Sequence, residues 1–372
     1  MSTLLVVAGE ASGDRAAAAV LGHLPSVRAF GLGGPALASR GVELASDLRA
    51  STALGFGEAM ARAWGVAQAW RALGKAIRAR SPRAALLVDY TEFNARLAPK
   101  LRADGVPVVW YGAPQIWAWR SKRAASFRDR VDKMAVMLPF EEKLWRAAGV
   151  DAQYVGHPAM EGPMLGRQAA RGTLGMTPYA AAVAILPGSR PHEVRRLLEP
   201  MLDAYERVRS DRASIDARVL VASSLDDTTR DWMAGVCAAR HVQLFDVDPH
   251  TGALGVLGAF EAALCASGSA SLEAVLAHAV PVVAYRVGLT TEVAARALLA
   301  TPHIALPNIL LGRSAFAEVL QRDVAPQKLH DALARALDDR AARLVACREV
   351  AAVLGDERRP SARVAEMLAP WL

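Results

Sequence analysis

Short apolar runs alternate with longer Ala-, Leu- and Arg-rich segments of helical period along most of the chain, and this alternation constrains the fold more than any single motif. Apolar runs without polar alternation are typical of parallel strands that are covered on both faces. The segments between them are long enough for crossover helices, so the pattern predicts repeated βαβ units. Ten strands are predicted, at Leu4–Ala8, Arg28–Leu32, Ala85–Asp89, Val106–Tyr111, Met134–Leu138, Ala182–Leu186, Arg218–Ala222, Val242–Phe245, Ala262–Cys265 and Pro281–Tyr285.

Ten strands are many for one open twisted sheet, and 372 residues are enough for two full cores, so two sheets in two domains are predicted. The predicted fold class is α/β, with two Rossmann-like parallel-sheet domains facing across a cleft and a helical C-terminal region. Glycines and prolines are dense between Pro158 and Pro178, which favours a boundary there. The expected parts are residues 1–160, a linker at 161–178, residues 179–345, and helices over 346–372 that pack back on the first domain or on a partner subunit. Ligands of such sheets bind at the carboxyl ends of the strands.

The charge balance and the cysteines narrow the class of protein. Lys and Arg number 44 against 37 Asp and Glu, a net charge of +7. This mild basic excess fits anionic partners, but the positive residues are spread without a recognition motif, so nucleic acid is not an expected partner. The cysteines, Cys237, Cys265 and Cys347, form no CxxC pair, which disfavours a disulfide framework or zinc ribbon and fits a reducing compartment. No run approaches the ~20 apolar residues of a spanning helix, and the N-terminus does not resemble a signal peptide.

One basic segment raises the question of a membrane surface. Residues 60 to 83 read as a long helix with tryptophans, six basic residues and no acidic one. That composition resembles an interfacial membrane helix, whereas an ordinary amphipathic helix, solvated on one face, is the more common structure.

Polar residues follow the first predicted strand at the start of an Ala-rich helix: Glu10, Ser12, Gly13 and Asp14. Glycine permits close approach to the backbone, and the helix N-terminus offers free N–H groups to an anion or a hydroxyl. A helix cap explains Ser12 or Asp14 equally well. Asp89 ends a buried strand, where a general base lies in this fold. We favour a catalytic role for it, because a cap does not require a position inside the apolar run.

The segment 110–120, WYGAPQIWAWR, begins at the end of the strand Val106–Tyr111 and contains three tryptophans. A rigid aromatic loop can form an acceptor pocket or a membrane-facing edge, although core packing explains at least one of these side chains better. His157 stands at the expected domain junction, where it is either a structural histidine or a ligand contact at the hinge.

Two loops of the second half have the composition of a nucleotide-sugar pocket. Gly188, Ser189 and Arg190 open a helix, so backbone donors and a bidentate cation are available to a diphosphate. The GK[ST] ending of a Walker A loop is absent, and a capped helix start with a surface arginine is the alternative. The run from Ser267 to Glu273 brings small residues and hydroxyls after a strand, then an acid that can accept from paired sugar hydroxyls or simply complement the helix dipole.

A series of motifs in a fixed order carries more information than any of these loops. They are AGEASGD (8–14), GLGGPAL (31–37), VDYTEFN (88–94), APQIWAWRSKR (113–123), LPFEEKLW (138–145), VGHP (155–158), LPGSR (186–190), ASGSASLE (266–273), YR (285–286), LPNILLGR (306–313) and AEVLQ (317–321). Together they resemble the lipid-A-disaccharide synthases, the glycosyltransferases of lipopolysaccharide synthesis, over nearly the whole chain.

The resemblance implies a GT-B fold and an inverting transfer that uses neither a metal nor a cofactor. In the implied reaction, UDP-2,3-diacylglucosamine and 2,3-diacylglucosamine 1-phosphate (lipid X) give lipid A disaccharide 1-phosphate and UDP. By analogy, Asp89 deprotonates the acceptor 6-hydroxyl, Arg190 holds the diphosphate and Glu273 the ribose. The residues expected to bind substrate are Glu10, Ser12, Gly13, Asp14, Asn94, Gln115, Trp117, Arg120 and His157. Those expected to bind UDP are Gly188, Ser189, Arg190, Ser267, Gly268, Ser269, Glu273 and Asn308.

The resemblance also implies a location and partners. The first domain is expected to take the acceptor and to lie on the membrane side, and the second to bind the UDP-sugar. The protein is expected to be cytoplasmic and peripheral on the anionic inner membrane of a Gram-negative bacterium, with a homodimer through the C-terminal region as a further partner expectation.

Three departures from the family pattern leave other functions open. Tyr90, Thr91 and Glu92 replace the middle of the usual D-x-P-D-F-N, no aspartate follows Gly-His-Pro closely, and Ala317 stands where Pro or Lys is common. The alternatives are another GT-B UDP-sugar enzyme, epimerase-like or of the peptidoglycan transferase type, and a divergent paralogue without catalysis. The aromatic loop speaks against the first, and the presence of both Asp89 and Arg190 speaks against the second.

Overall fold

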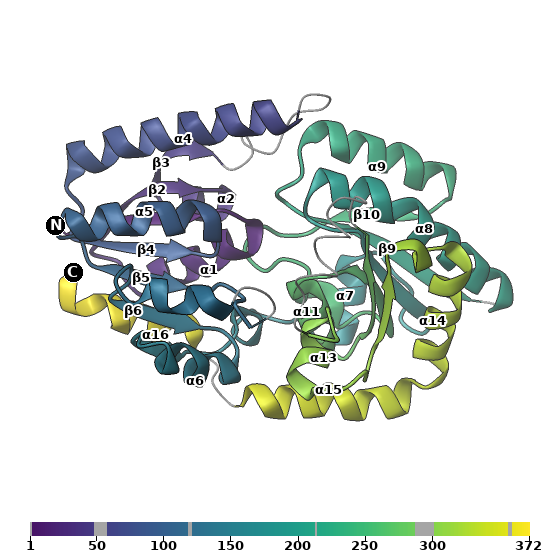
Figure 1. Ribbon diagram of the computed structural model, residues 1–372. Coiled ribbons are helices and arrows are strands. Elements are labelled where there is room, and N and C mark those ends of the chain that lie inside the picture. The colour runs from purple at the N-terminus through teal and green to yellow at the C-terminus, as the bar shows by residue number, and fades with distance from the viewer. Residues whose placement is uncertain (1, 48–57, 118–120, 213, 287–300, 356–358) are drawn as a thin grey trace. The chain divides into compact units, whose positions relative to one another are not determined.

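The computed structural model describes residues 2–47, 58–117, 121–212, 214–286, 301–355 and 359–372. The chain divides into two compact units. Their residues can be found in Figure 1 by colour, which follows the residue number. The first comprises Met1–Glu161 and Asp356–Leu372, and the second comprises Gly162–Gly355.

The first unit is built on a parallel sheet in the order β3-β2-β1-β4-β5-β6-β7. Its strands are β1 (Thr3–Ala8), β2 (Arg28–Gly33), β3 (Glu43–Asp47), β4 (Ala84–Val88), β5 (Val108–Tyr111), β6 (Lys133–Val136) and β7 (Ala152–Tyr154). Leu5 and Val7 of β1 face one apolar cluster and Leu4 and Val6 face another. Both faces of the sheet are therefore covered, which explains why its central strands read as unbroken apolar runs.

Different helices cover the two faces. The cluster on one face includes residues of α4 (Glu58–Arg80), α5 (Thr91–Ala103) and α6 (Pro139–Ala147). The cluster on the other includes residues of α1 (Ala11–Gly22), α2 (Pro35–Ser39) and α16 (Pro360–Leu368). Short 3-10 segments lie at η1 (Ser121–Phe127), η2 (Pro158–Met160) and η4 (Ala369–Trp371). Figure 1 shows α16, in yellow, beside the strands of this unit, so a segment far along the chain completes its core.

The second unit repeats the plan with a parallel sheet in the order β10-β9-β8-β11-β12-β13. Its strands are β8 (Ala181–Leu186), β9 (Ile215–Val221), β10 (Gln243–Asp246), β11 (Ala262–Ala266), β12 (Val280–Tyr285) and β13 (Ala317–Leu320). Its helical segments are α7 (Arg167–Thr173), α8 (Pro191–Asp211), α9 (Asp227–Ala239), α10 (Leu254–Leu257), α11 (Ser269–Leu276), α13 (Leu306–Leu311), η3 (Gln321–Asp323), α14 (Pro326–Asp338) and α15 (Arg340–Leu354). Two parallel sheets with crossover helices confirm the predicted α/β class.

Each sheet has one point at which the strand order reverses. In the first unit the chain builds outward from β1 to β3 and then returns to place β4 on the other side of β1. In the second unit it builds outward from β8 to β10 and returns with β11 beside β8. The loops after β1 and β4 therefore flank the crevice of the first sheet, and those after β8 and β11 flank the crevice of the second, where open α/β sheets bind ligands.

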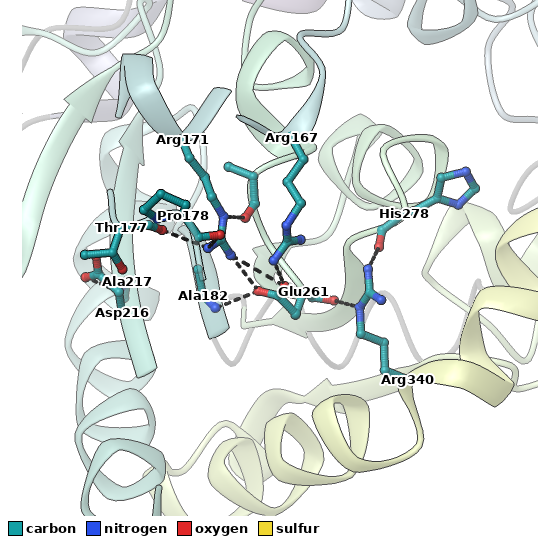
Figure 2. A network of polar contacts seen from close by, with 11 residues as sticks. Arg167, Arg171, Thr177, Pro178, Ala182, Asp216, Ala217, Glu261, His278 and Arg340 are labelled. Atoms are coloured by element: carbon teal, nitrogen blue, oxygen red, sulfur yellow. Dashed lines mark hydrogen bonds and ion pairs between the residues drawn. The ribbon is translucent and has the colours of Figure 1, made fainter. Parts of the chain in front are cut away.

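The boundary between the units differs from the expected one. Of the linker expected at 161–178, residues 162–178 belong to the second unit. Figure 2 shows why they are fixed there: Arg167 and Arg171 of α7 converge on Glu261, which also accepts a hydrogen bond from the Ala182 amide at 2.6 Å. Helix α15 also stays in the second unit, whereas α16 and η4 belong to the first. The expected homodimer through this region stays a prediction.

The described part of α4 has an ordinary amphipathic arrangement. Val66, Trp70 and Ile77 pack against the core of the first unit, and the Trp70 ring meets Phe93 edge-on at 5.1 Å. The exposed face carries Gln68, Arg71, Lys75, Arg78 and Ala79. From residue 65 onward, then, the apolar side of this helix is used inside the protein, and what it offers outward is positive charge.

Within the described residues, no helix has the length and apolarity needed to cross a bilayer.

Candidate functional site

Asp89 lies at the strand-order reversal of the first sheet, immediately after β4. Its amide donates to the Tyr111 carbonyl at 3.0 Å, which extends the pairing of β4 with β5 by one residue. Its side chain lies between two glycines. A Cβ added at Gly13 would lie 3.3 Å from Asp89 Oδ2, and one added at Gly112 would overlap Oδ1. Asp89 therefore needs the space that two neighbouring loops leave open by having no side chain.

The backbone that carries Asp89 is strained. Asp89 and Tyr90 both have left-handed φ angles, +47° and +44°, a conformation that side-chain-bearing residues rarely adopt. The buried Asn94 holds this turn, because its amide nitrogen donates to the Asp89 carbonyl at 2.9 Å and the Val88 carbonyl at 3.4 Å. Tyr90 also stacks on Phe93, with ring centroids 5.0 Å apart. Asn94, expected to bind substrate, thus lies beneath the turn and supports Asp89.

The surroundings of Asp89 favour its protonated form. Burial, followed by the negative charges of Glu10 and Glu141, raises the pKa of Asp89 to about 7. A carboxyl group with a pKa near neutrality both takes up and releases a proton readily, which is what general base catalysis requires.

Of the other residues expected to bind substrate after β1, some lie near Asp89 and one caps a neighbouring helix. Glu10 precedes α1, half-buried and within electrostatic reach of Asp89. Ser12 and Gly13 lie in the first turn of α1, with Gly13 against the Asp89 carboxylate. The buried Asp14 carboxylate caps α2, accepting from the amides of Gly34 at 2.7 Å and Ala36 at 2.8 Å, so it shapes the loop after β2.

His157 follows the edge strand β7 and is buried and neutral. Its Nδ1 accepts a hydrogen bond from the Ala159 amide at 3.1 Å, so in the neutral ring the proton is on Nε2. Burial lowers the pKa of His157 to about 4. The side chain can thus act as a hydrogen-bond donor through Nε2 at neutral pH, but not as a cation.

The segment after β5 is held at both ends. Trp110 is fully buried in the core, and its Nε1 donates to the Gly112 carbonyl at 3.0 Å. Gln115 is exposed, and Trp117 is half-buried with its indole Nε1 donating to Glu141 at 2.9 Å. Arg120, the last residue expected to bind substrate here, lies outside the described residues.

Glu141 is the residue of this site that the sequence reasoning missed. It is 2% exposed at the third position of α6, where it also accepts from the Leu138 amide at 3.1 Å. The signal was present in the sequence as a proline at the first helical position followed by an acid two residues later. That pattern predicts a helix start, but it does not say that the acid lies within electrostatic reach of Asp89.

The reversal point of the second sheet carries the other group of expected residues. The turn after β8 places Gly188 at a φ of +130°, and a Cβ added there would lie 2.6 Å from Glu193 Oε2. The Glu193 carboxylate accepts from the Ser189 amide and from Arg190 Nη1, both at 3.2 Å. Arg190 is the residue before α8, with 45% of its side chain exposed. The turn thus presents a helix N-terminus and a guanidinium together.

The neighbouring loop after β11 completes this group. Ser267, Gly268 and Ser269 lie at the start of α11, and Gly268 has a φ of +151° with nothing within 4 Å of an added Cβ. Glu273 lies one turn into α11 and is 7% exposed. Among the described residues, no group of three His, Cys, Asp or Glu is placed to hold a metal ion.

Asn308 has a different position from that expected of a UDP contact. Its amide nitrogen donates to Phe316 O at 2.9 Å and to Glu318 Oε1 at 2.8 Å. Its carbonyl oxygen accepts from the amides of Ala315 at 3.0 Å and Phe316 at 2.9 Å. These four bonds use the full capacity of a carboxamide, so Asn308 organises the chain before β13, and a bond to UDP requires one of them to break.

Comparisons with solved structures show the fold of the chain, and comparisons of sequence show its family. The N. meningitidis UDP-GlcNAc 2-epimerase bound to UDP-GlcNAc is 8% identical, with a TM-score of 0.62 over 100% of this chain and 99% of that one. The calicheamicin glycosyltransferase CalG4 is 14% identical, with a TM-score of 0.61 over 100% and 98% of the two chains. At such identities these likenesses show the GT-B-type fold alone.

The sequence comparisons are more specific. Residues 4–368 match the family described as Lipid-A-disaccharide synthetase. The lipid-A-disaccharide synthase of Anaeromyxobacter dehalogenans (strain 2CP-C) is 42% identical over 371 residues, which cover 98% of this chain and 96% of the relative. Because both similarities extend over almost the whole chain, it belongs to the lipid-A-disaccharide synthetase family of glycosyltransferases.

Proposed function

We propose that the protein transfers the sugar of UDP-2,3-diacylglucosamine to the 6-hydroxyl of 2,3-diacylglucosamine 1-phosphate with inversion at the anomeric carbon. The products are lipid A disaccharide 1-phosphate and UDP. The observation that carries the proposal is Asp89, a carboxyl at the reversal point of the first sheet whose pKa is raised to about 7. The substrate class is inferred from the family to which the chain belongs, and Asp89 is the base that an inverting transfer needs.

In the proposed step, Asp89 accepts the proton of the acceptor 6-hydroxyl while that oxygen bonds to the anomeric carbon. The bond from the anomeric carbon to the UDP oxygen breaks, and the electron pair leaves with UDP. One new C–O bond replaces one old one, with a single proton moved to Asp89. The His157 imidazole, neutral with its proton on Nε2, is available as a donor to the acceptor.

The second unit is proposed to hold the leaving group. Negative charge develops on the UDP phosphates as the glycosidic bond breaks, and preorganised donors stabilise such charge strongly. The N-terminus of α8 and the guanidinium of Arg190 supply those donors, because backbone N–H groups and a bidentate cation both suit phosphate oxygens. Glu273 is proposed to accept from the ribose hydroxyls, with Ser267, Gly268 and Ser269 lining the pocket.

The test is a discontinuous assay with both lipid substrates in detergent micelles, in which disaccharide 1-phosphate is scored by mass spectrometry. Product that requires both substrates and forms in the presence of EDTA supports the proposal. Release of UDP or isomerisation of the donor sugar without the lipid acceptor contradicts it and favours another UDP-sugar activity on the same fold. Binding of UDP without any turnover indicates a paralogue that kept the donor pocket and lost the reaction.

Gly112 offers a test of where the Asp89 carboxylate must lie. In Gly112→Ala the new Cβ overlaps Asp89 Oδ1 and lies 2.9 Å from Met137 Cε, so the carboxylate has to move. A displacement of about 1 Å can reduce turnover on the order of 100-fold, and we expect a kcat loss of that size. Steady-state rates in the micelle assay measure it.

Gly105→Ala is the matched control for Gly112→Ala. Gly105 lies in the same unit at a φ of +74°, but nothing lies within 4 Å of an added Cβ. Both variants carry the strain of a left-handed alanine, of about 1–3 kcal/mol, and only one disturbs Asp89. Equal losses of kcat in the two variants would mean that backbone strain, and not the carboxylate position, limits the rate.

We also propose that the protein is cytoplasmic and docks peripherally on the anionic inner membrane through the exposed basic face of α4. Arg71, Lys75 and Arg78 recur at helical spacing on that face, and each basic residue near an anionic surface contributes about 1 kcal/mol of attraction. The triple alanine variant is therefore expected to bind anionic vesicles roughly 100-fold more weakly in a sedimentation assay at low salt. Unchanged binding would place the contact elsewhere.

A further inference from the structure

Glu141 is a buried carboxylate with two hydrogen-bond donors from different parts of the chain. Its Oε2 accepts from the Leu138 amide at 3.1 Å and its Oε1 accepts from the Trp117 indole at 2.9 Å. The first bond caps the start of α6. The second joins α6 to the segment after β5 and has no role in capping.

The bond to Trp117 fixes the far end of the segment 112–117. Its near end is already fixed, because the Gly112 amide donates to the Ala135 carbonyl at 3.0 Å. Ile116 is 4% exposed and adds an apolar anchor between the two ends. The Trp117 ring also meets Phe140 edge-on, with centroids 5.3 Å apart, so two consecutive residues of α6 hold one side chain.

Each of the two carboxylate oxygens of Glu141 accepts from a different donor. A glutamine at this position has one carbonyl oxygen, and its NH₂ group would face the second N–H donor. Burying a carboxylate is unfavourable unless it is well hydrogen-bonded, so its presence at 2% exposure requires an explanation beyond a helix cap. Its neighbour Glu142 accepts from the Tyr154 amide at 2.7 Å and pairs with Arg146 at 3.1 Å, at the ordinary exposure of a first-turn acid.

Glu141 is also one of the charges that act on Asp89. The titratable groups within electrostatic reach of Asp89 are Glu10 after β1, Tyr111 on β5 and Glu141 on α6. Burial raises the pKa of Glu141 itself to about 7, against the opposing effect of its bonds from Trp117 and from the backbone of Leu138 and Met137. The carboxyl groups of Asp89 and Glu141 therefore titrate in the same pH range and influence each other.

We propose that Glu141 is a positioning residue of the transfer reaction: by accepting from Trp117 it fixes the segment 112–117, whose first residue lies against the Asp89 carboxylate, for the acceptor. Its carboxyl group also acts electrostatically on Asp89. This inference rests on the proposed function and goes beyond it, since no role in the reaction followed from the motif in which Glu141 lies. Trp117 is the side chain expected to contact the acceptor, and Glu141 would act through it.

The two effects of Glu141 are separable by substitution. In Glu141→Gln one of the two donors loses its acceptor, so we expect kcat/KM for the lipid acceptor to fall on the order of tenfold, mainly through KM. Loss of the negative charge also lowers the pKa of Asp89, so the acid limb of the kcat/KM profile should move to lower pH. Trp117→Phe removes the indole N–H and leaves the Glu141 carboxyl group in place, so KM should rise with a smaller displacement of the acid limb than in Glu141→Gln.

Glu142→Gln is the matched control, because it neutralises the adjacent first-turn acid of the same helix. It should lower stability by a similar amount and leave the acceptor KM and the acid limb as in the wild type. If Glu141→Gln and Glu142→Gln give the same profile, Glu141 is a helix cap only and the inference is wrong. If Glu141→Gln does not fold, a wild-type acceptor KM in Trp117→Phe overturns the positioning role by itself.

The wild-type assay keeps this inference distinct from the proposed function. If the wild type forms no disaccharide, the proposed function is wrong, whatever rates the variants show. If the wild type forms disaccharide and Glu141→Gln has the same KM and pH profile, the proposed function stands and the positioning role of Glu141 is wrong.

Discussion

In the Asp89→Asn variant we expect kcat to fall by about 10³-fold with no change in the melting temperature, because asparagine keeps the shape of the side chain but cannot accept a proton. The space between Gly13 and Gly112 fits the amide as well as the carboxylate, so the fold is not disturbed. Removing a buried group with a raised pKa also removes an unfavourable charge, which argues against any loss of stability. The micelle assay and thermal unfolding measure the two quantities.

The pH dependence of the wild type is part of the same expectation. The base must be unprotonated to act, and the pKa of Asp89 is raised to about 7. The value of kcat/KM should therefore be constant above that pH and fall as the pH drops below it, with the loss tenfold for each further unit. In Asp89→Asn this acid limb should disappear.

Asp104→Asn serves as the control, since Asp104 is exposed at the opposite end of α5 from Asp89. It should retain the wild-type rate and pH profile. Activity in Asp89→Asn within tenfold of the wild type, with the acid limb retained, would show that another group takes the acceptor proton.

The second large effect concerns stability, in the Arg171→Leu variant. Arg171 is 1% exposed, and its guanidinium donates to the carbonyls of Ala259, Thr177 and Pro178 at 2.8–3.0 Å. It also pairs with Glu261 at 3.3 Å (Figure 2). Leucine leaves these acceptors buried without their donor. Loss of one partner from a buried ionic network is expected to destabilise the second unit by about 3–5 kcal/mol.

Arg167→Leu is a close control because Arg167 pairs with the same carboxylate but has a side chain that is 44% exposed. An exposed pair contributes about 1 kcal/mol or less, so this variant should unfold almost as the wild type does. Native-state hydrogen exchange of peptides from β8 and β11 in the full chain measures the difference. Similar protection in the two variants would show that burial of Arg171 adds nothing to the network.

The strands show how far the sequence determines the fold. All ten predicted strands are present, and the three that were not predicted, β3, β7 and β13, each lie at a sheet edge. An edge strand has a neighbour on one side only and is kept short or polar, so it lacks the unbroken apolar run that identified the others. Glu43 and Asp47 in β3 and Gln153 in β7 illustrate this composition.

The candidate site was less accessible to sequence reasoning than the sheets. Asp89 could be found because a carboxylate at the end of an apolar run has few structural explanations. Asp14 and Asn308 were chosen from their motifs, yet their side chains bond the backbone of other segments, and a motif does not say where a hydrogen bond goes. Glu141 was missed for the opposite reason, because its motif had a sufficient explanation as a helix start.

The return of α16 to the first unit has a consequence for biosynthesis. Val364, Met367 and Leu368 of α16 pack on the face of the sheet that carries Leu4 and Val6. A ribosome makes the whole of the second unit before it makes these residues. The Glu161 carboxylate at the end of the first segment then accepts from the Ser361 amide at 3.0 Å, which joins the early and late parts of the unit.

The first unit, whose main segment is translated first, is therefore completed last. Throughout elongation of the second unit, the apolar surface of α1 and β5 on which α16 packs stays uncovered in the nascent chain. Surface of that kind attracts chaperones and favours aggregation until it is buried. A messenger truncated before the codons of α16 yields a protein whose second unit is complete and whose Asp89-bearing unit remains open.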